Sequence, residues 1–217
     1  MSGLVLVFGE SLNDARAIAE LIIALCPELT GKVKPSPRPT SLTRTAHIDK
    51  VSKWAAAVAD VVNAFRARGK PVQCVFVHRD ADQQDPDAML ARATEEALTA
   101  AGVQHAHAVV PIESIESWWL CFPQAVETFV PGWSGALRNP PGDVDRVATP
   151  KGELIRRTRA ALPKRPYGEA DSHGIARQVR LLGIVRTPHG KSDSYSRFVR
   201  VVDGCCSHQK LVPGSGG

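Results

Sequence analysis

A run of β-branched and aromatic residues near the middle of the chain stops abruptly at two carboxylates. Residues 72–77 read Val-Gln-Cys-Val-Phe-Val, and residues 78–82 read His-Arg-Asp-Ala-Asp. In an α/β protein, this pattern places acidic groups at the carboxyl end of a buried strand, where functional sites collect. Two neighbouring carboxylates repel each other unless a cation lies between them, and Mg²⁺ prefers such oxygen ligands. Asp80 and Asp82 therefore predict a metal site for phosphate chemistry; the alternative is a pair of ordinary turn or capping aspartates.

Strand and helix patterns alternate along the first 120 residues. Short apolar runs are typical of buried strands, and the segments between them have helical periodicity that stops at Gly or Pro. In chain order, the predicted elements are a strand at 4–8, a helix at 14–25, a loop with a short edge strand at its start at 32–40, a helix at 47–68, a strand at 72–77, a helix at 85–101, a strand at 105–110 and a short helix within 111–120. This order predicts an α/β fold with a mostly parallel sheet flanked by helices.

The last third of the chain has a different pattern. Residues 131–150 are rich in Pro and Gly, which predicts a long connection. Helical periodicity returns at 151–162, 172–182 and 193–203, with basic side chains opposite the apolar stripe. We therefore expect an α/β core at 1–130, a connection at 131–150, a basic helical extension at 151–210 that packs on the core, and a disordered tail at 211–217.

Charge is distributed unevenly between these parts. Residues 1–150 contain 14 Lys/Arg and 17 Asp/Glu, a net of −3, whereas residues 151–217 contain 13 and 5, a net of +8. A basic segment beside an acidic site suits an anionic polymer, although a solvated basic surface has the same pattern. The predicted nucleic-acid contacts are Arg79, Arg156, Arg157, Arg177, Arg180 and Arg197.

The five cysteines form an odd set without a Cys-x-x-Cys spacing. This argues against a structural zinc site and against a disulfide framework. Cys26, Cys74 and Cys121 lie in apolar patterns and are expected to be small core residues, while the adjacent Cys205 and Cys206 are assigned no role. No apolar run reaches the length of a membrane span, and the first residues do not resemble a signal peptide. We therefore expect a cytoplasmic protein without a membrane segment.

Acidic residues follow three of the predicted strands. Glu10 comes after the first strand, Asp80 and Asp82 after the central strand, and Glu113 and Glu116 after the last. The carboxyl ends of parallel strands share one edge of a sheet, so these side chains are expected to converge. Such a cluster implies Mg²⁺ or Mn²⁺. The sequence leaves open which of Glu113 and Glu116 is the ligand, because acids are also favoured at the start of a helix.

These motifs together resemble the Toprim domain of topoisomerases, primases and OLD-family nucleases. The resemblance is closer to a bacterial family of stand-alone Toprim-like proteins. Its segments correspond here to Gly9-Glu10-Ser11-Leu12-Asn13-Asp14, to Arg79-Asp80-Ala81-Asp82 and to Glu113-Ser114-Ile115-Glu116-Ser117-Trp118. Pro150-Lys151 and residues 194–198 resemble the helical C-terminal part of the same family. Ser11 and Asn13 depart from the glycine and threonine that are usual there, and neither departure removes a carboxylate.

The resemblance implies a role for each residue. Asp80 and Asp82 would hold the metal, Glu10 would be a ligand or a general acid/base, and Glu113 or Glu116 would complete the metal shell. Lys151 is the first candidate, and Arg79 the second, for the cation that stabilises charge on the phosphorus.

The resulting prediction is a metal-dependent nuclease that hydrolyses DNA or RNA. The resemblance further implies a role in bacterial defence against phage or plasmids, beside an ABC- or AAA-type ATPase partner. Two alternatives stay open: a phosphohydrolase of a small molecule, and a non-catalytic subunit that binds nucleic acid or an ATPase. Trp118 and Trp119 fit either base stacking or the hydrophobic core. The sequence is also compatible with a homo-oligomer.

Overall fold

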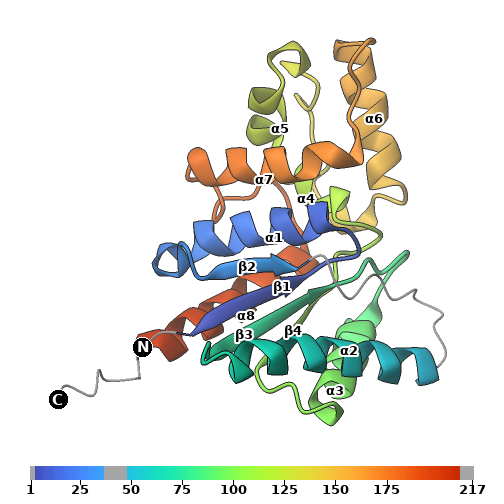
Figure 1. Cartoon of the computed structure of the whole chain (residues 1–217). Coiled ribbons are helices and arrows are strands. Elements are labelled where there is room, and N and C mark those ends of the chain that lie inside the picture. The colour runs from blue at the N-terminus through green and yellow to red at the C-terminus, as the bar shows by residue number, and fades with distance from the viewer. Residues whose placement is uncertain (1–2, 37–47, 211–217) are drawn as a thin grey trace.

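The computed structural model describes residues 3–36 and 48–210 and contains one four-stranded parallel sheet (Figure 1). The strand order is β2-β1-β3-β4, and the bounds are Leu4–Phe8 for β1, Val33–Ser36 for β2, Val72–His78 for β3 and Ala106–Val109 for β4. The predicted α/β class is confirmed, including the short edge strand β2. The predicted tail at 211–217 and part of the loop at 32–40 lie outside the described residues.

The central strands β1 and β3 are buried on both faces. Their alternating side chains enter two separate hydrophobic clusters, with Val5 and Phe76 on one face and Leu6 and Val75 on the other. Burial on both faces explains why these strands are continuous apolar runs in the sequence rather than alternating ones.

Helices cover both faces of this sheet (Figure 1). One face is covered by α2 (Ile48–Ala67) and α3 (Met89–Ala100). The other carries α1 (Leu12–Leu25) and α8 (Asp193–Lys210). Further out on this second side lie the shorter helices α4 (Glu116–Leu120), α5 (Pro123–Phe129), α6 (Pro150–Ala161) and α7 (Ser172–Leu181). Short 3-10 turns lie at Pro27–Leu29 (η1), Pro86–Ala88 (η2), Pro131–Trp133 (η3), Val144–Arg146 (η4) and Glu169–Asp171 (η5). None of the described helices combines the length and apolar character that crossing a membrane requires.

The basic C-terminal segment is part of the main hydrophobic core. Trp118, at 0% exposure, packs against the rings of Tyr195 and Phe198 at centroid distances of 5.3 and 5.1 Å. Its indole N–H donates to Ser194 Oγ at 2.9 Å. The neighbouring Trp119 is equally buried. The two tryptophans are therefore core residues, and α8 is part of the same core.

Local sequence determines where two helices begin. Helix α1 starts at Leu12 because Ser11 and Asp14 form a reciprocal capping box. Helix α3 starts at Met89, later than the predicted residue 85, because Asp87 and Ala88 both have φ of 55° and interrupt the helix.

The expectation that the cysteines form no disulfides is wrong. Two disulfides link the end of α8 to the rest of the fold: Cys26–Cys206 and Cys74–Cys205. Cys121 stays a buried free thiol. Adjacent residues on a helix project about 100° apart, so Cys205 and Cys206 reach different partners. The prediction of a reducing compartment depended on unpaired cysteines and loses that support.

Candidate functional site

The order of the strands creates a topological switch point between β1 and β3. From β1 the chain crosses to β2 on one side, and the later strands β3 and β4 lie on the other. In open α/β sheets, the crevice outside the carboxyl ends of the two strands at such a point is the usual ligand site. Glu10 follows β1 and Asp80 follows β3, so both lie at this crevice.

Glu10 and Asp80 are in direct contact although 70 residues separate them. The backbone N–H of Asp80 donates to Glu10 Oε1 at 3.2 Å. Gly9 permits the tight turn that places Glu10, because a Cβ at this position would lie 2.6 Å from the backbone nitrogen of Ala15 and 2.7 Å from Ser11 O. Glycine is therefore the residue that fits between β1 and α1.

Replacing Gly9 with alanine should destabilise the protein by about 1–3 kcal/mol, because the added methyl group forces β1 and α1 apart. Gly142→Ala is the matched control, since a Cβ there meets nothing within 4 Å. Urea unfolding followed by circular dichroism measures both changes. Equal stability of the two variants would contradict the close approach at Gly9.

The carboxylate of Asp80 is held in place by one of its two oxygens. Oδ1 accepts the N–H of Ile115 at 3.0 Å and lies 3.1 Å from His78 Nε2. Within residues 3–36 and 48–210, Oδ2 receives no hydrogen bond, and the side chain is 21% exposed. Asp80 is thus oriented by the protein on one side and open to a ligand on the other.

Glu116 provides a buried carboxylate near Asp80. Its side chain is 4% exposed overall and accepts a hydrogen bond from the hydroxyl of Tyr167 at 3.0 Å. The charge of Asp80 is one of the influences on its pKa. The backbone carbonyl of Glu113 accepts the N–H of Asp82 at 2.9 Å. Glu116 is therefore a buried carboxylate under the electrostatic influence of Asp80.

Asp82 and Lys151 lie around this centre. Asp82 is exposed with φ of 57°, and its negative charge contributes to the raised pKa of Glu10. Lys151 lies at the start of α6 and forms an ion pair with Glu169. That pair raises the pKa of Lys151, as do the charges of Glu116 and Asp80. The structure therefore brings the predicted Glu10, Asp80, Asp82, Glu116 and Lys151 into one electrostatic neighbourhood.

Burial and mutual repulsion shift the acid–base behaviour of this neighbourhood. Burial raises the pKa of Glu10, and the charge of Asp80 raises it further. Burial also raises the pKa of Glu116. For His78, burial lowers the pKa, but the hydrogen bond and charge of Asp80 outweigh it and the pKa is raised. These carboxyl groups are therefore harder to ionise than ordinary ones. A bound cation would favour their ionised form by neutralising part of the negative charge.

Without divalent ions, these shifts should make the protein lose stability as the pH rises. When folding raises the pKa of a carboxyl group, the stability that the group contributes is complete at pH values below its unfolded-state pKa of 4.5. That contribution is lost as the pH rises through the folded-state pKa. We expect Glu116→Gln, which still accepts from Tyr167, to flatten the slope of unfolding free energy at pH values above 4.5 by at most about 1.4 kcal/mol per pH unit. Urea unfolding in EDTA measures this slope.

Mg²⁺ should offset that loss once the pH is high enough to ionise the carboxylates. At a concentration of 100 times its dissociation constant, the ion would stabilise the wild type by about 2.7 kcal/mol. An identical pH slope in the wild type and in Glu116→Gln would contradict the raised pKa.

The carboxylates do not form a compact cage. Among the described residues, the one group of three or more metal-ligating atoms that all lie within 4.8 Å of one another is Cys26, Glu28 and Cys206. A spread arrangement of oxygens at the switch point fits Mg²⁺, which keeps several waters and is held by one or two carboxylates. It does not fit an ion that requires a complete protein shell. Glu10 and Asp80 are accordingly the residues that could hold the ion, and Asp82 and Glu116 add negative charge around them.

The predicted nucleic-acid contacts differ in their surroundings. Arg79 is 3% exposed, so it cannot serve as the surface contact that was predicted or as an accessible second cation. Arg156 and Arg157 share Glu153, and Arg180 pairs with Glu20 at 2.6 Å. Arg197 lies 3.9 Å from Asp85 at a pocket of about 540 Å³. Arg177 is exposed, and within the described ranges it forms no ion pair.

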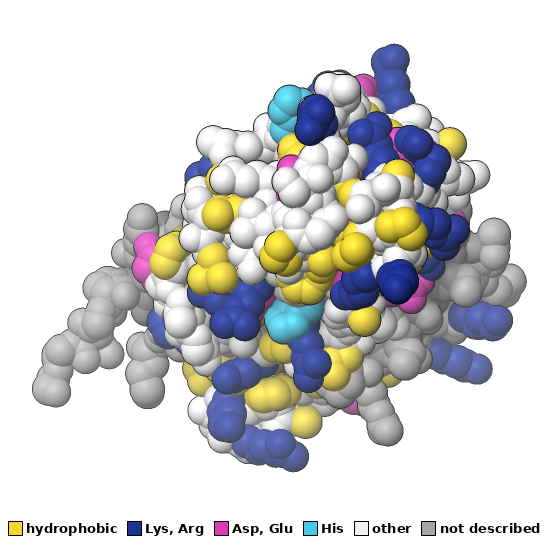
Figure 2. All heavy atoms as spheres, turned by 90° about the horizontal axis from the view of Figure 1, so that it is seen from above, with side chains coloured by type: hydrophobic (Ala, Val, Ile, Leu, Met, Phe, Trp, Pro, Cys, Tyr) yellow, Lys and Arg dark blue, Asp and Glu magenta, His cyan; other side chains and the backbone are white. Residues whose placement is uncertain are grey.

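A basic surface lies on the side of α5, α6 and α7. Figure 2 views this side from above and shows Lys and Arg side chains spread across it, with few acidic ones. Helices α6 and α7 supply Arg156 and Arg177, and the loop between them supplies Lys164, all exposed. Surface ion pairs such as Arg156–Glu153 contribute little energy, so these cations stay available to phosphates.

Two site residues were not predicted from the sequence. His78 lies at the end of β3 beside Asp80, and its position next to a strand-end acid was the one available signal. Tyr167 reaches Glu116 and Ser172 from a loop without any motif, so nothing in the sequence indicates it.

No protein-family model, curated protein or solved structure matches this chain.

Proposed function

We propose that this protein is a metal-dependent nuclease whose centre is the pair Glu10 and Asp80. The observation that carries the proposal is their contact at the switch point, where Asp80 Oδ2 receives no hydrogen bond from the described residues. Carboxylates placed in this way from separate strands serve cation binding better than fold stability, because burial and repulsion disfavour their charge.

The proposed cofactor is Mg²⁺, with Mn²⁺ as its substitute, held by Glu10 and Asp80. A bound ion of this kind polarises a phosphoryl oxygen and lowers the pKa of water. The donor set consists of carboxylate oxygens, which are the ligands that these hard ions prefer.

The chain's own residues would orient the metal ligands and neutralise negative charge on the phosphate. His78 fixes Asp80 through Oδ1, so the second oxygen keeps a constant direction. Glu10 would share the ion with Asp80, and the cation would offset the burial and repulsion that raise the pKa of Glu10. Lys151 would place positive charge opposite the carboxylates, where the phosphate gains charge during the reaction.

A polymeric substrate is favoured over a small one by the basic surface of α6 and α7. Exposed Arg156, Lys164 and Arg177 would follow a phosphate backbone beyond the reacting group. An ATPase partner and a role in anti-phage or anti-plasmid defence depend on the family resemblance alone and stay predictions.

Incubation of the purified full chain with plasmid, linear DNA, RNA and mononucleotides tests the proposal. We expect cleavage of at least one polymer with Mg²⁺ or Mn²⁺ and none with EDTA. Turnover of mononucleotides alone would instead indicate a small-molecule phosphohydrolase. Binding of a polymer without any turnover would indicate a non-catalytic subunit.

A further inference from the structure

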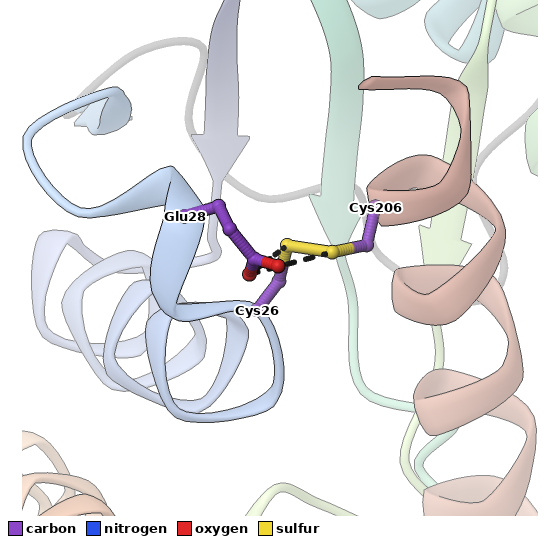
Figure 3. A group of neighbouring side chains, drawn as sticks. All are labelled: Cys26, Glu28 and Cys206. Carbon is purple, nitrogen blue, oxygen red and sulfur yellow. Dashed lines mark hydrogen bonds between the residues drawn. A yellow bond between two sulfur atoms is a disulfide. The ribbon is translucent and has the colours of Figure 1, made fainter. Parts of the chain in front are cut away.

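Three potential metal ligands converge at the end of the molecule opposite the carboxylate site. Cys26 is the residue that ends α1, Glu28 lies in the following turn η1, and Cys206 lies in the last part of α8 (Figure 3). Glu10 precedes α1, so the two sites are separated by the length of this 14-residue helix, about 21 Å. The cysteine group is therefore a separate site from the proposed nuclease centre.

The position of Glu28 is not explained by the disulfide. Its Oε2 lies 3.5 Å from Cys26 Sγ and 3.8 Å from Cys206 Sγ, as the dashed lines in Figure 3 show. Disulfide sulfurs carry no hydrogen, so the carboxylate gains no hydrogen bond from either of them. Two thiols, or two thiolates that share a cation, would give this carboxylate favourable partners.

The distances around Glu28 match those of a tetrahedral zinc site. With Zn–S of about 2.3 Å and Zn–O of about 2.0–2.2 Å, tetrahedral angles place a ligand sulfur and oxygen about 3.5 Å apart. The two observed sulfur–oxygen distances are already near this value. All three ligand atoms lie within 4.8 Å of one another. Cutting the S–S bond and letting the two sulfurs separate is the main change that such a site requires.

Solvent reaches the group from one side. Glu28 is exposed, Cys206 is half-buried and Cys26 is buried. A reductant and an ion can therefore approach past Glu28, while the buried Cys26 thiolate holds the inner coordination position.

We propose that Cys26, Cys206 and Glu28 form a redox-gated zinc site. A reductant of the dithiol class donates two electrons and two protons to the Cys26–Cys206 bond and itself becomes a disulfide. Zn²⁺ then replaces the two thiol protons, which are released, and Glu28 provides the third ligand with water in the fourth position. The oxidised protein lacks the thiolates and binds no zinc, yet both states tie the end of α8 to the end of α1.

The test is a Co²⁺ and Zn²⁺ titration of the full chain, oxidised or reduced with a phosphine, with circular dichroism as the check on folding. We expect the reduced wild type to bind one equivalent of Co²⁺ with the visible bands of a tetrahedral thiolate site, and Zn²⁺ to displace it. Oxidised protein should bind none. Cys206→Ser and Cys26→Ser should abolish the bands, and Glu28→Gln, which keeps both thiols, should weaken binding at least about tenfold.

Cys121→Ser and Cys205→Ser are the controls, because both leave the three proposed ligands in place. Each should still bind one equivalent in the reduced form. Three results would overturn the proposal: no tetrahedral Co²⁺ signal in reduced folded protein, the same signal in oxidised protein, or loss in Cys205→Ser with retention in Cys206→Ser. Nuclease activity is not the readout, so failure here leaves the carboxylate site untouched.

Discussion

Replacing Asp80 with asparagine should lower metal-dependent cleavage of nucleic acid by about 10²–10³-fold or more. Asparagine has nearly the same shape and can still accept the N–H of Ile115, but it removes the negative charge of the carboxylate. Affinity for the ion should fall together with turnover. Cleavage of labelled DNA or RNA at saturating Mn²⁺, and Mn²⁺ binding by electron paramagnetic resonance, measure the two effects separately.

Asp87→Asn is the matched control for that experiment. Asp87 is an exposed aspartate nearby with φ of 55°, a conformation that asparagine also tolerates. We expect the Asp87 variant to cleave at the wild-type rate. Equal activity of the wild type and the Asp80 variant, in preparations with the same purity, would contradict the assignment of Asp80 as a metal ligand.

Trp118→Ala should lower the free energy of unfolding by about 3–5 kcal/mol. The indole is fully buried between β-sheet and α8, contacts Tyr195 and Phe198, and donates to Ser194. Its removal leaves a cavity where the C-terminal helix meets the core. Urea unfolding by far-ultraviolet circular dichroism measures the change, with all proteins kept in the same disulfide state.

Met89→Ala provides the comparison for Trp118, because Met89 is a large apolar residue that is 60% exposed. Its replacement should change stability by no more than about 0.5 kcal/mol. If Trp118→Ala were as mild as Met89→Ala while abolishing nucleic-acid binding, the tryptophan would be a stacking residue rather than a core residue.

The fold could be predicted because the burial of a strand or helix determines the spacing of its apolar residues in the sequence. The strands β1 and β3 are covered on both faces and therefore appear as continuous apolar runs, while α1 and α2 keep helical periodicity between them. A parallel sheet aligns the carboxyl ends of its strands, which is why the sequence alone predicts that Glu10 and Asp80 lie together. The capping box of Ser11 and Asp14 fixes one helix start locally.

The rest depends on contacts that sequence does not encode locally. Tyr167 reaches Glu116 across 51 residues, and nothing in either segment indicates the pair. The two disulfides depend on how α8 is rotated against the sheet, since Cys205 and Cys206 face different partners. The odd cysteine count does not exclude disulfides, because Cys121 stays a buried free thiol while the other four cysteines pair.

The most direct test of the carboxylate site is an anomalous difference map from crystals grown with Mn²⁺. The proposed function predicts a peak at coordination distance from the carboxylates of Glu10 and Asp80, at the carboxyl ends of β1 and β3, and no such peak in the Asp80→Asn variant. A fully ordered crevice that holds no peak at saturating Mn²⁺, or a peak that persists unchanged in the variant, would contradict it.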